Sequence, residues 1–149
     1  MNKIPQATIY AKQTGVSITP YERHSEGRAT EGRVALRFFR LASGSSSIRF
    51  IAEPAEAFAL HDKMQRVFRD GGQESLNHRF EGSDGEVKTR LTVERWERNG
   101  KSGFAFTVQR GEEQVNVPVH AERFLYAAEF LRHLSLQQAW VEEFEQTVS

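Results

Sequence analysis

The feature that most constrains this chain is a change of hydrophobic period between residues 89 and 134. Apolar and polar side chains alternate along residues 91–93, 104–108 and 115–119, as they do in strands that bury one face. Asn99-Gly100 lies between the first two segments and favours a tight hairpin. From Phe124 onward the apolar spacing is helical. The stretch therefore predicts three antiparallel strands whose apolar side packs on a helix.

The first half of the chain predicts the same order of elements. Strands are expected near residues 8–12, 17–23, 33–41 and 48–52. A helix should begin at Pro54, which suits a first helical turn, and end at the glycines after Asp70. Residues 25–32 are polar with two glycines and predict a loop, and residues 43–47 predict a flexible connection. Pro20 favours an edge position or a bulge in the second strand.

In the second half, a strand near residues 76–81 and a turn at 82–85 precede a long strand over 87–98. Ser135 and Gln138 have the spacing of a capping box. They predict a last helical stretch in which Leu136, Trp140 and Phe144 supply apolar contacts.

The two expected helices open alike, which indicates an internal repeat. Ala-Glu-x-Phe begins at Ala55 and again at Ala121, an offset of 66 residues that aligns Leu60 with Tyr126. Either half alone has little core, and two halves joined can share one. The predicted fold is α+β, with two tandem units of four strands and a helix whose antiparallel sheets pack around a helical core. We expect a single pseudo-symmetric domain over 1–149: repeat one at about 7–72, repeat two at about 73–134 and a C-terminal helical extension at 135–149.

Composition excludes several classes of protein. Charged residues are 27% and hydrophobic residues 38% of the 149, which suits a globular chain. There is no cysteine, and therefore no disulfide framework or zinc–thiolate site. No apolar run has membrane-spanning length, so we expect no membrane partner. The expected location is the cytoplasm, with association with the nucleoid left open. Net charge is zero, but residues 1–70 carry 11 basic and 7 acidic side chains, whereas 73–149 carry 9 and 13.

Four segments carry a resemblance to a known superfamily: VALRFFRL at 34–41, IRFIAEPAEAFALHDKM at 48–64, TRLTVERWERNGKSGFAFTVQR at 89–110 and VNVPVHAERFLYAAEFL at 115–131. Two tandem units of four strands and a helix are similar to the Whirly-type single-stranded nucleic-acid-binding proteins. That superfamily includes the plant Whirly proteins, the Pur-alpha repeat proteins, and the positive-cofactor transcription coactivators with their bacterial and phage relatives. The local likeness is best to the coactivator domain.

The resemblance implies that single strands lie across the solvent side of the sheets. It implies DNA in preference to RNA, little sequence preference, and a role in transcription or in DNA replication, recombination or repair. Exposed rings stack on bases while Arg and Lys follow the phosphates. From alternation, the outward candidates in the first half are Tyr10, Lys12, Tyr21, Arg23, Arg37, Phe39 and Arg49. In the second half they are Arg79, Arg90, Thr92, Trp96, Arg98, Lys101 and Gln109, with Thr107 and Asn116 as further hydrogen-bonding groups.

Other interpretations of these residues stay open. The outward arginines could form cross-strand ion pairs with Glu94, Glu97 or Glu112, and Trp96 and Phe39 could be buried against the other half or another subunit. The rival function is a protein-interaction or scaffold module without nucleic-acid binding, and a sheet protein that binds small molecules is a third alternative. We expect a homo-oligomer. The acidic residues at 142–145 fit a solvated helix face better than a tail that recruits basic proteins or competes with nucleic acid.

We expect no enzyme activity, cofactor or metal. The five histidines lack metal-ligand spacing such as HExxH. Gly100-Lys101-Ser102 resembles the end of a phosphate-binding P-loop, but Arg95 stands where that motif needs glycine. No serine–histidine–aspartate or paired-carboxylate arrangement can be identified.

Overall fold

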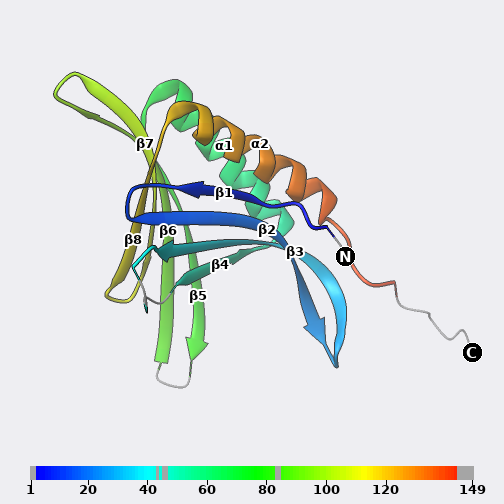
Figure 1. Ribbon diagram of the computed structural model, residues 1–149. Helices are drawn as coiled ribbons and strands as arrows, with labels where there is room; N and C mark the ends of the chain where they lie inside the picture. Colours follow the sequence, from blue (N-terminus) through cyan, green and yellow to red (C-terminus); the bar gives the residue numbers. More distant parts are fainter. Residues whose placement is uncertain (1–2, 43, 45–46, 83–84, 144–149) are drawn as a thin grey trace, which may run out of the picture.

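The computed structural model describes residues 3–42, 44, 47–82 and 85–143. Within these residues, four strands and a helix are followed by four more strands and a second helix (Figure 1), so the predicted fold class is confirmed. The first unit consists of β1 Ala7–Tyr10, β2 Thr14–Ser25, β3 Arg28–Arg40, β4 Ile48–Ala52 and α1 Pro54–Asp70. The second consists of β5 Gly72–Gly82, β6 Gly85–Arg98, β7 Lys101–Arg110, β8 Glu113–Val119 and α2 Ala121–Gln137.

Each set of four strands forms its own antiparallel sheet in chain order. We call β1–β4 the first sheet and β5–β8 the second sheet. The two sheets cross each other, and both helices lie side by side over their inner faces (Figure 1). The inner face of each sheet is apolar, and the opposite, outer face carries the polar partners of the alternation. The connection at 43–47 and the turn at 82–85 each include residues outside those described.

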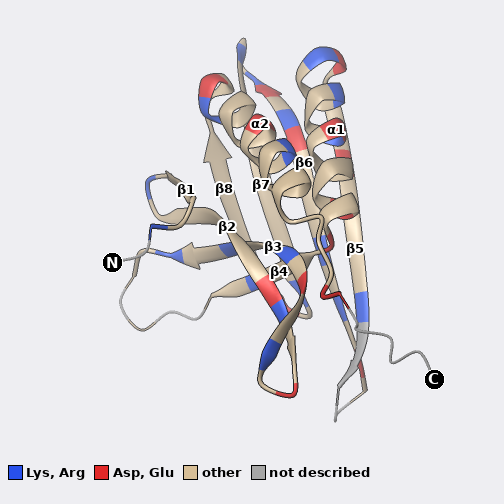
Figure 2. Ribbon diagram, turned by 90° about the vertical axis from the view of Figure 1, so that its right-hand side faces the viewer, with Lys and Arg blue, Asp and Glu red and all other residues tan. Residues whose placement is uncertain are grey.

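Two hairpin turns use left-handed backbone conformations. At the predicted Asn99-Gly100 turn, φ is 52° and 76°, as a two-residue hairpin turn requires. The loop predicted at 25–32 is wrong. Glu26 and Gly27, with φ of 53° and 81°, form a second tight turn, and β2 and β3 continue to it as a two-stranded arm. Acidic and basic residues are interspersed along this arm (Figure 2). Both of its faces meet water, so its sequence lacks the apolar alternation that marks a half-buried strand.

The helices bury equivalent stripes. α1 begins at Pro54 as predicted, and the backbone N–H of Glu53 donates to the Glu56 carboxylate at 3.1 Å. The helix bounds are 67 residues apart (54 to 121, 70 to 137), not 66. At an offset of 67, the buried residues of α1 align with buried residues of α2: Ala57, Leu60, Met64 and Val67 with Phe124, Ala127, Leu131 and Leu134. The sequence alignment of Leu60 with Tyr126 is therefore wrong, because Tyr126 is exposed.

The halves are joined through one apolar cluster and several polar contacts. Phe104 of β7 stacks on Phe68 of α1 at 5.5 Å and on Phe124 of α2 at 4.5 Å, measured between ring centroids. Across the two sheets, the rings of Phe38 and Phe106 lie 6.5 Å apart. These contacts place residues of both halves in the same core.

The C-terminal segment differs from the helix expected over 135–149. Ser135 lies inside α2, where its hydroxyl donates to the Arg132 carbonyl at 2.6 Å instead of capping a new helix. Beyond Gln137 the chain runs along β3: the Gly32 N–H donates to the Trp140 carbonyl at 3.0 Å, and the Glu142 N–H donates to the Thr30 carbonyl at 2.6 Å. Phe144 lies outside the described residues. Residues 138–142 thus extend the first sheet beyond the end of β4.

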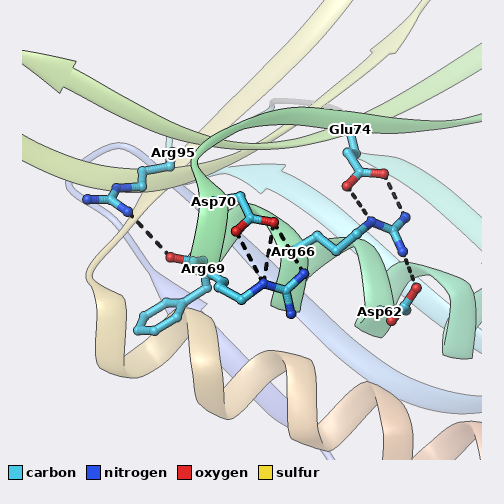
Figure 3. A network of polar contacts seen from close by, with 7 residues as sticks. Asp62, Arg66, Arg69, Asp70, Glu74 and Arg95 are labelled. Atoms are coloured by element: carbon cyan, nitrogen blue, oxygen red, sulfur yellow. Dashed lines mark hydrogen bonds and ion pairs between the residues drawn. The ribbon is translucent and has the colours of Figure 1, made fainter.

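A polar network ties the C-terminal half of α1 to β5 (Figure 3). The Arg66 guanidinium donates to both Glu74 carboxylate oxygens, at 2.7 and 2.8 Å, and also to Asp62. Hydrogen bonds from Arg66 hold the pKa of Glu74 below its ordinary value of 4.5, with a further contribution from Lys63 at 3.6 Å. Glu74 in turn raises the pKa of Arg66. No helix in the described ranges is both long and apolar enough to cross a bilayer.

Candidate nucleic-acid interface

A hollow of about 280 Å³ lies on the outer face of the first sheet. Five of the outward candidates from the sequence line it: Tyr10, Tyr21, Arg37, Phe39 and Arg49. Thr8, Ser17 and Thr19 add hydroxyl groups to its floor. Tyr10 is 69% exposed and Tyr21 37% exposed. The structure therefore brings rings, cations and hydroxyls from four strands to one surface, which we call the sheet hollow.

Two arginines of the sheet hollow face each other. Arg37 of β3 is the direct cross-strand partner of Arg49 of β4. The Arg37 guanidinium lies 4.9 Å from the centroid of the Phe39 ring, and that of Arg49 lies 5.7 Å from the Tyr21 ring. Within the described part of the chain, no carboxylate lines the hollow or pairs with either arginine. Like charges directly opposite on a sheet are destabilising, so an anionic ligand would relieve this pair.

Glycines allow two aromatic rings to lie flat across neighbouring strands. A Cβ at Gly15, the cross-strand partner of Phe39, would come within 2.5 Å of the Phe39 ring. Gly103 is the partner of Trp96 in the second sheet, and a Cβ there would overlap the indole. The Trp96 N–H also donates to the Phe104 carbonyl at 3.3 Å. Both rings are half-exposed, so the burial considered for them from sequence is incomplete in the single chain.

A groove of about 690 Å³ lies between the β1 end of the first sheet and the β7–β8 side of the second, at the start of α2. Four sequence candidates line it: Tyr10, Lys12, Trp96 and Lys101. Tyr10 also lines the sheet hollow, so one side chain borders both depressions. His120 and Arg123 complete the groove and were not among the candidates. Arg123 lies in the first turn of α2, and no local pattern indicates that it approaches β1.

The outer face of the second sheet carries a polar row. Thr92, Thr107 and Asn116 are cross-strand neighbours, and the Asn116 amide donates to the Thr107 hydroxyl at 2.7 Å. Arg90 lies opposite Gln109 and donates to the Ser75 hydroxyl at 3.2 Å. The predicted side of these residues is therefore the observed one.

Six predicted residues line neither depression: Arg90, Thr92 and Gln109 on the outer face of the second sheet, and Arg23, Arg79 and Arg98 elsewhere. Arg79 of β5 pairs with Glu86 at 3.6 Å, and Arg23 on the β2–β3 arm pairs with Glu31 at 3.8 Å. Arg98 is exposed at the β6–β7 turn. Glu97, one of the ion-pair partners considered from sequence, pairs with Arg95 at 3.7 Å. Among the described residues, no group of three or more histidine and carboxylate side chains could hold a metal ion.

The fold and these faces define a class: tandem four-strand-plus-helix proteins with cationic and aromatic outer sheet faces. No family model matches the sequence, and no curated protein matches it. Solved structures do match. WHY1 from Arabidopsis thaliana is 16% identical over 93% of this chain and 87% of its own, with a TM-score of 0.61. WHY3 from Arabidopsis thaliana is 18% identical over 93% and 90%, and the plant transcriptional regulator PBF-2 is 16% identical over 93% and 84%, each with a TM-score of 0.60. The chain therefore has the Whirly fold, as the sequence resemblance predicted.

Proposed function

We propose that this protein is a non-enzymatic module that binds single-stranded nucleic acid, DNA in preference to RNA, with little sequence preference. The observation that carries the proposal is the Arg37–Arg49 pair, which lies among exposed rings without a carboxylate partner among the described residues. A phosphate backbone would neutralise the two guanidiniums. Bases stacked on Tyr10 and Phe39 would contribute roughly 1–3 kcal/mol each. A place in transcription is supported by the description of PBF-2 as a transcriptional regulator.

The test is fluorescence anisotropy with labelled oligo-dT, matched oligo-U and a duplex of equal length, at low salt. The wild-type chain should bind the DNA single strand most tightly. The double change Arg37→Gln with Arg49→Gln should weaken binding about tenfold or more. If both arginines contact phosphates, it should also reduce the slope of log K against log salt by about 1.4, since each phosphate contact contributes about 0.7 on single strands.

The matched control is Arg69→Gln with Arg132→Gln, which removes the same charge from the helices. Both control residues make exposed ion pairs, with Asp70 and Glu129, and such pairs contribute little to stability. The control should bind as the wild type does. If both double variants bind equally weakly, binding depends on the total charge of the protein and not on the Arg37–Arg49 pair. If the wild type does not bind at low salt, the proposal is wrong.

A second copy of this chain is the competing occupant of the same faces, because their exposed rings would suit a subunit interface. We expect a homo-oligomer, and sedimentation velocity distinguishes whether the outer faces assemble it. Trp96→Arg would then dissociate the assembly and leave oligonucleotide affinity unchanged. The opposite result, an unchanged assembly with altered affinity, supports the nucleic-acid interface.

A further inference from the structure

The groove between the sheets combines aromatic rings and cations from both halves of the chain. Its walls come from both halves: Tyr10 and Lys12 from the first, and Trp96, Lys101 and Arg123 from the second. Its volume of about 690 Å³ lies in the range of small-molecule sites. A site of this kind forms only when the two halves pack together.

The indole of Trp96 is held in a fixed position in this groove. One ring face lies on Gly103, where a Cβ would overlap it, and the N–H bond to the Phe104 carbonyl fixes its edge. The opposite ring face is therefore left toward the groove that Trp96 lines. A fixed, half-exposed indole is a stacking surface that needs little ordering when a flat ligand binds.

The charges around this indole are of one sign. Lys12, Lys101 and Arg123 line the groove, and no carboxylate of the described residues does. None of the three makes an ion pair with another described residue. An apolar peptide or a lipid chain would leave these cations unpaired, whereas a flat ring that carries a phosphate matches both the indole and the cations.

We infer that the groove is a subsite for one unstacked nucleotide of a bound single strand. Its base lies on the Trp96 ring, and its phosphates are contacted by Lys12, Lys101 and Arg123. Tyr10 borders the groove and the sheet hollow, and its ring makes an edge contact with Phe39 at 5.9 Å. The strand therefore passes over Tyr10 from the first sheet into the groove. This inference rests on the proposed function and adds a path and a base-sized site to it.

The experiment uses the full chain with Trp140→Phe, which leaves Trp96 as the only tryptophan. Oligo-dT is titrated while tryptophan fluorescence and the anisotropy of a labelled strand are followed. Binding should quench Trp96 at the same oligonucleotide concentration that raises the anisotropy. Arg123→Gln should weaken binding several-fold, whereas Arg132→Gln, the same change on the same helix but outside the groove, should not.

A further variant tests the stacking surface without removing it. Gly103→Ala displaces the indole, and it should reduce both the quenching and the affinity while the thermal midpoint shows that the chain stays folded. Anisotropy that rises while Trp96 stays silent overturns the subsite and leaves the proposed function standing. Absence of any strand binding overturns both. Quenching by dTMP with the affinity of oligo-dT would instead show a pocket for free nucleotides and overturn the strand path.

Discussion

At the scale of single residues, the outer face of the first sheet places two like charges side by side. Arg37 and Arg49 are opposite each other across β3 and β4, where an oppositely charged pair would be worth about 0.2–1 kcal/mol and a like pair is unfavourable by a similar amount. Stacking of the two guanidiniums on Phe39 and Tyr21 offsets this cost, since each exposed cation–π contact contributes about 0.5–1 kcal/mol.

Arg37→Glu should therefore separate stability from binding. It replaces the repulsion with a Glu–Arg cross-strand pair, so we expect a thermal midpoint equal to or above that of the wild type. It also places a carboxylate in the sheet hollow, so oligo-dT affinity should fall more than tenfold. Thermal unfolding and anisotropy on the same samples check both halves of the prediction. A lower midpoint together with unchanged affinity would contradict it.

Glu74 gives a prediction about pH. Its folded-state pKa lies below the ordinary 4.5 because Arg66 donates two hydrogen bonds to it. Between the lowered pKa and 4.5, the Glu74 carboxylate binds fewer protons in the folded chain than in the unfolded chain. The free energy of unfolding therefore rises with pH in that range. The contribution of Glu74 is present above pH 4.5 and is lost as pH falls through its lowered pKa. Glu74→Gln should lower the thermal midpoint at pH 7, and the difference from wild type should shrink at pH below 4.5. A difference that does not depend on pH would show that Glu74 acts by packing alone.

At the scale of elements, the segment 138–142 pairs with β3 through one antiparallel bridge, between Glu31 and Val141. Gly32 makes this approach possible, because a Cβ there would overlap the Gln138 backbone carbonyl. The Gln138 side chain also donates to the Tyr21 and Arg33 carbonyls, at 2.7 and 3.1 Å. These bonds connect the end of α2 to both strands of the β2–β3 arm.

Gly32→Ala should detach this segment. The added Cβ would overlap backbone atoms of Gln138, which cannot rotate away as the end of a flexible side chain can. We therefore expect destabilisation of about 1–3 kcal/mol. In a Trp96→Phe background, the fluorescence of Trp140 should shift to the red. Hydrogen exchange should become faster at the Glu142 amide, which now donates to Thr30, and stay slow in β7. Gly27→Ala is the control: it strains a turn glycine of φ 81° but its Cβ meets open space and does not touch residues 138–142, so it should leave Trp140 unaffected.

Element order and most element positions could be predicted from sequence, because alternation and helical spacing are local properties. The repeat offset could not be, because the shared Ala-Glu-x-Phe letters begin at different helical positions: Ala55 follows Pro54 inside α1, whereas Ala121 is the first residue of α2. The β2–β3 arm was missed because it has no buried face. The pairing of residues 138–142 with β3 was missed because it depends on hydrogen bonds of Gln138 and Trp140 to β2 and β3, which no local pattern shows.

At the scale of the whole molecule, the sequence predicts which side chains of the candidate site lie on the outer face of a sheet. It does not predict which of them lie next to one another. Alternation placed Arg37, Phe39 and Arg49 outward correctly. It could not show that Arg37 faces Arg49, since this depends on the register across the connection at 43–47. Arg123 lines the groove because α2 packs beside β1. This contact joins two segments that are distant in sequence, so no local pattern predicts it.

We propose that the two halves form one cooperative domain. His61 of α1 contacts the Ala128 carbonyl of α2 at 2.9 Å, and Glu56 of α1 pairs with His78 of β5 at 2.6 Å. Phe68 and Phe124 both stack on Phe104. Each half alone would expose these surfaces, and chains of this size are marginally stable even with a complete core.

Residues 1–71 and 72–149, made separately, should therefore lack stable structure, with far-UV circular dichroism of unfolded chains. The full chain should unfold in urea in a single transition. Trp96 fluorescence in a Trp140→Phe background reports the second half, whereas circular dichroism reports the equal-length helices of both. Coincident midpoints are the mark of two-state unfolding. An isolated half that folds would show two independent domains. So would a circular dichroism curve with two steps, of which only one coincides with the change in Trp96 fluorescence. The groove would then depend on a docking equilibrium between the two domains.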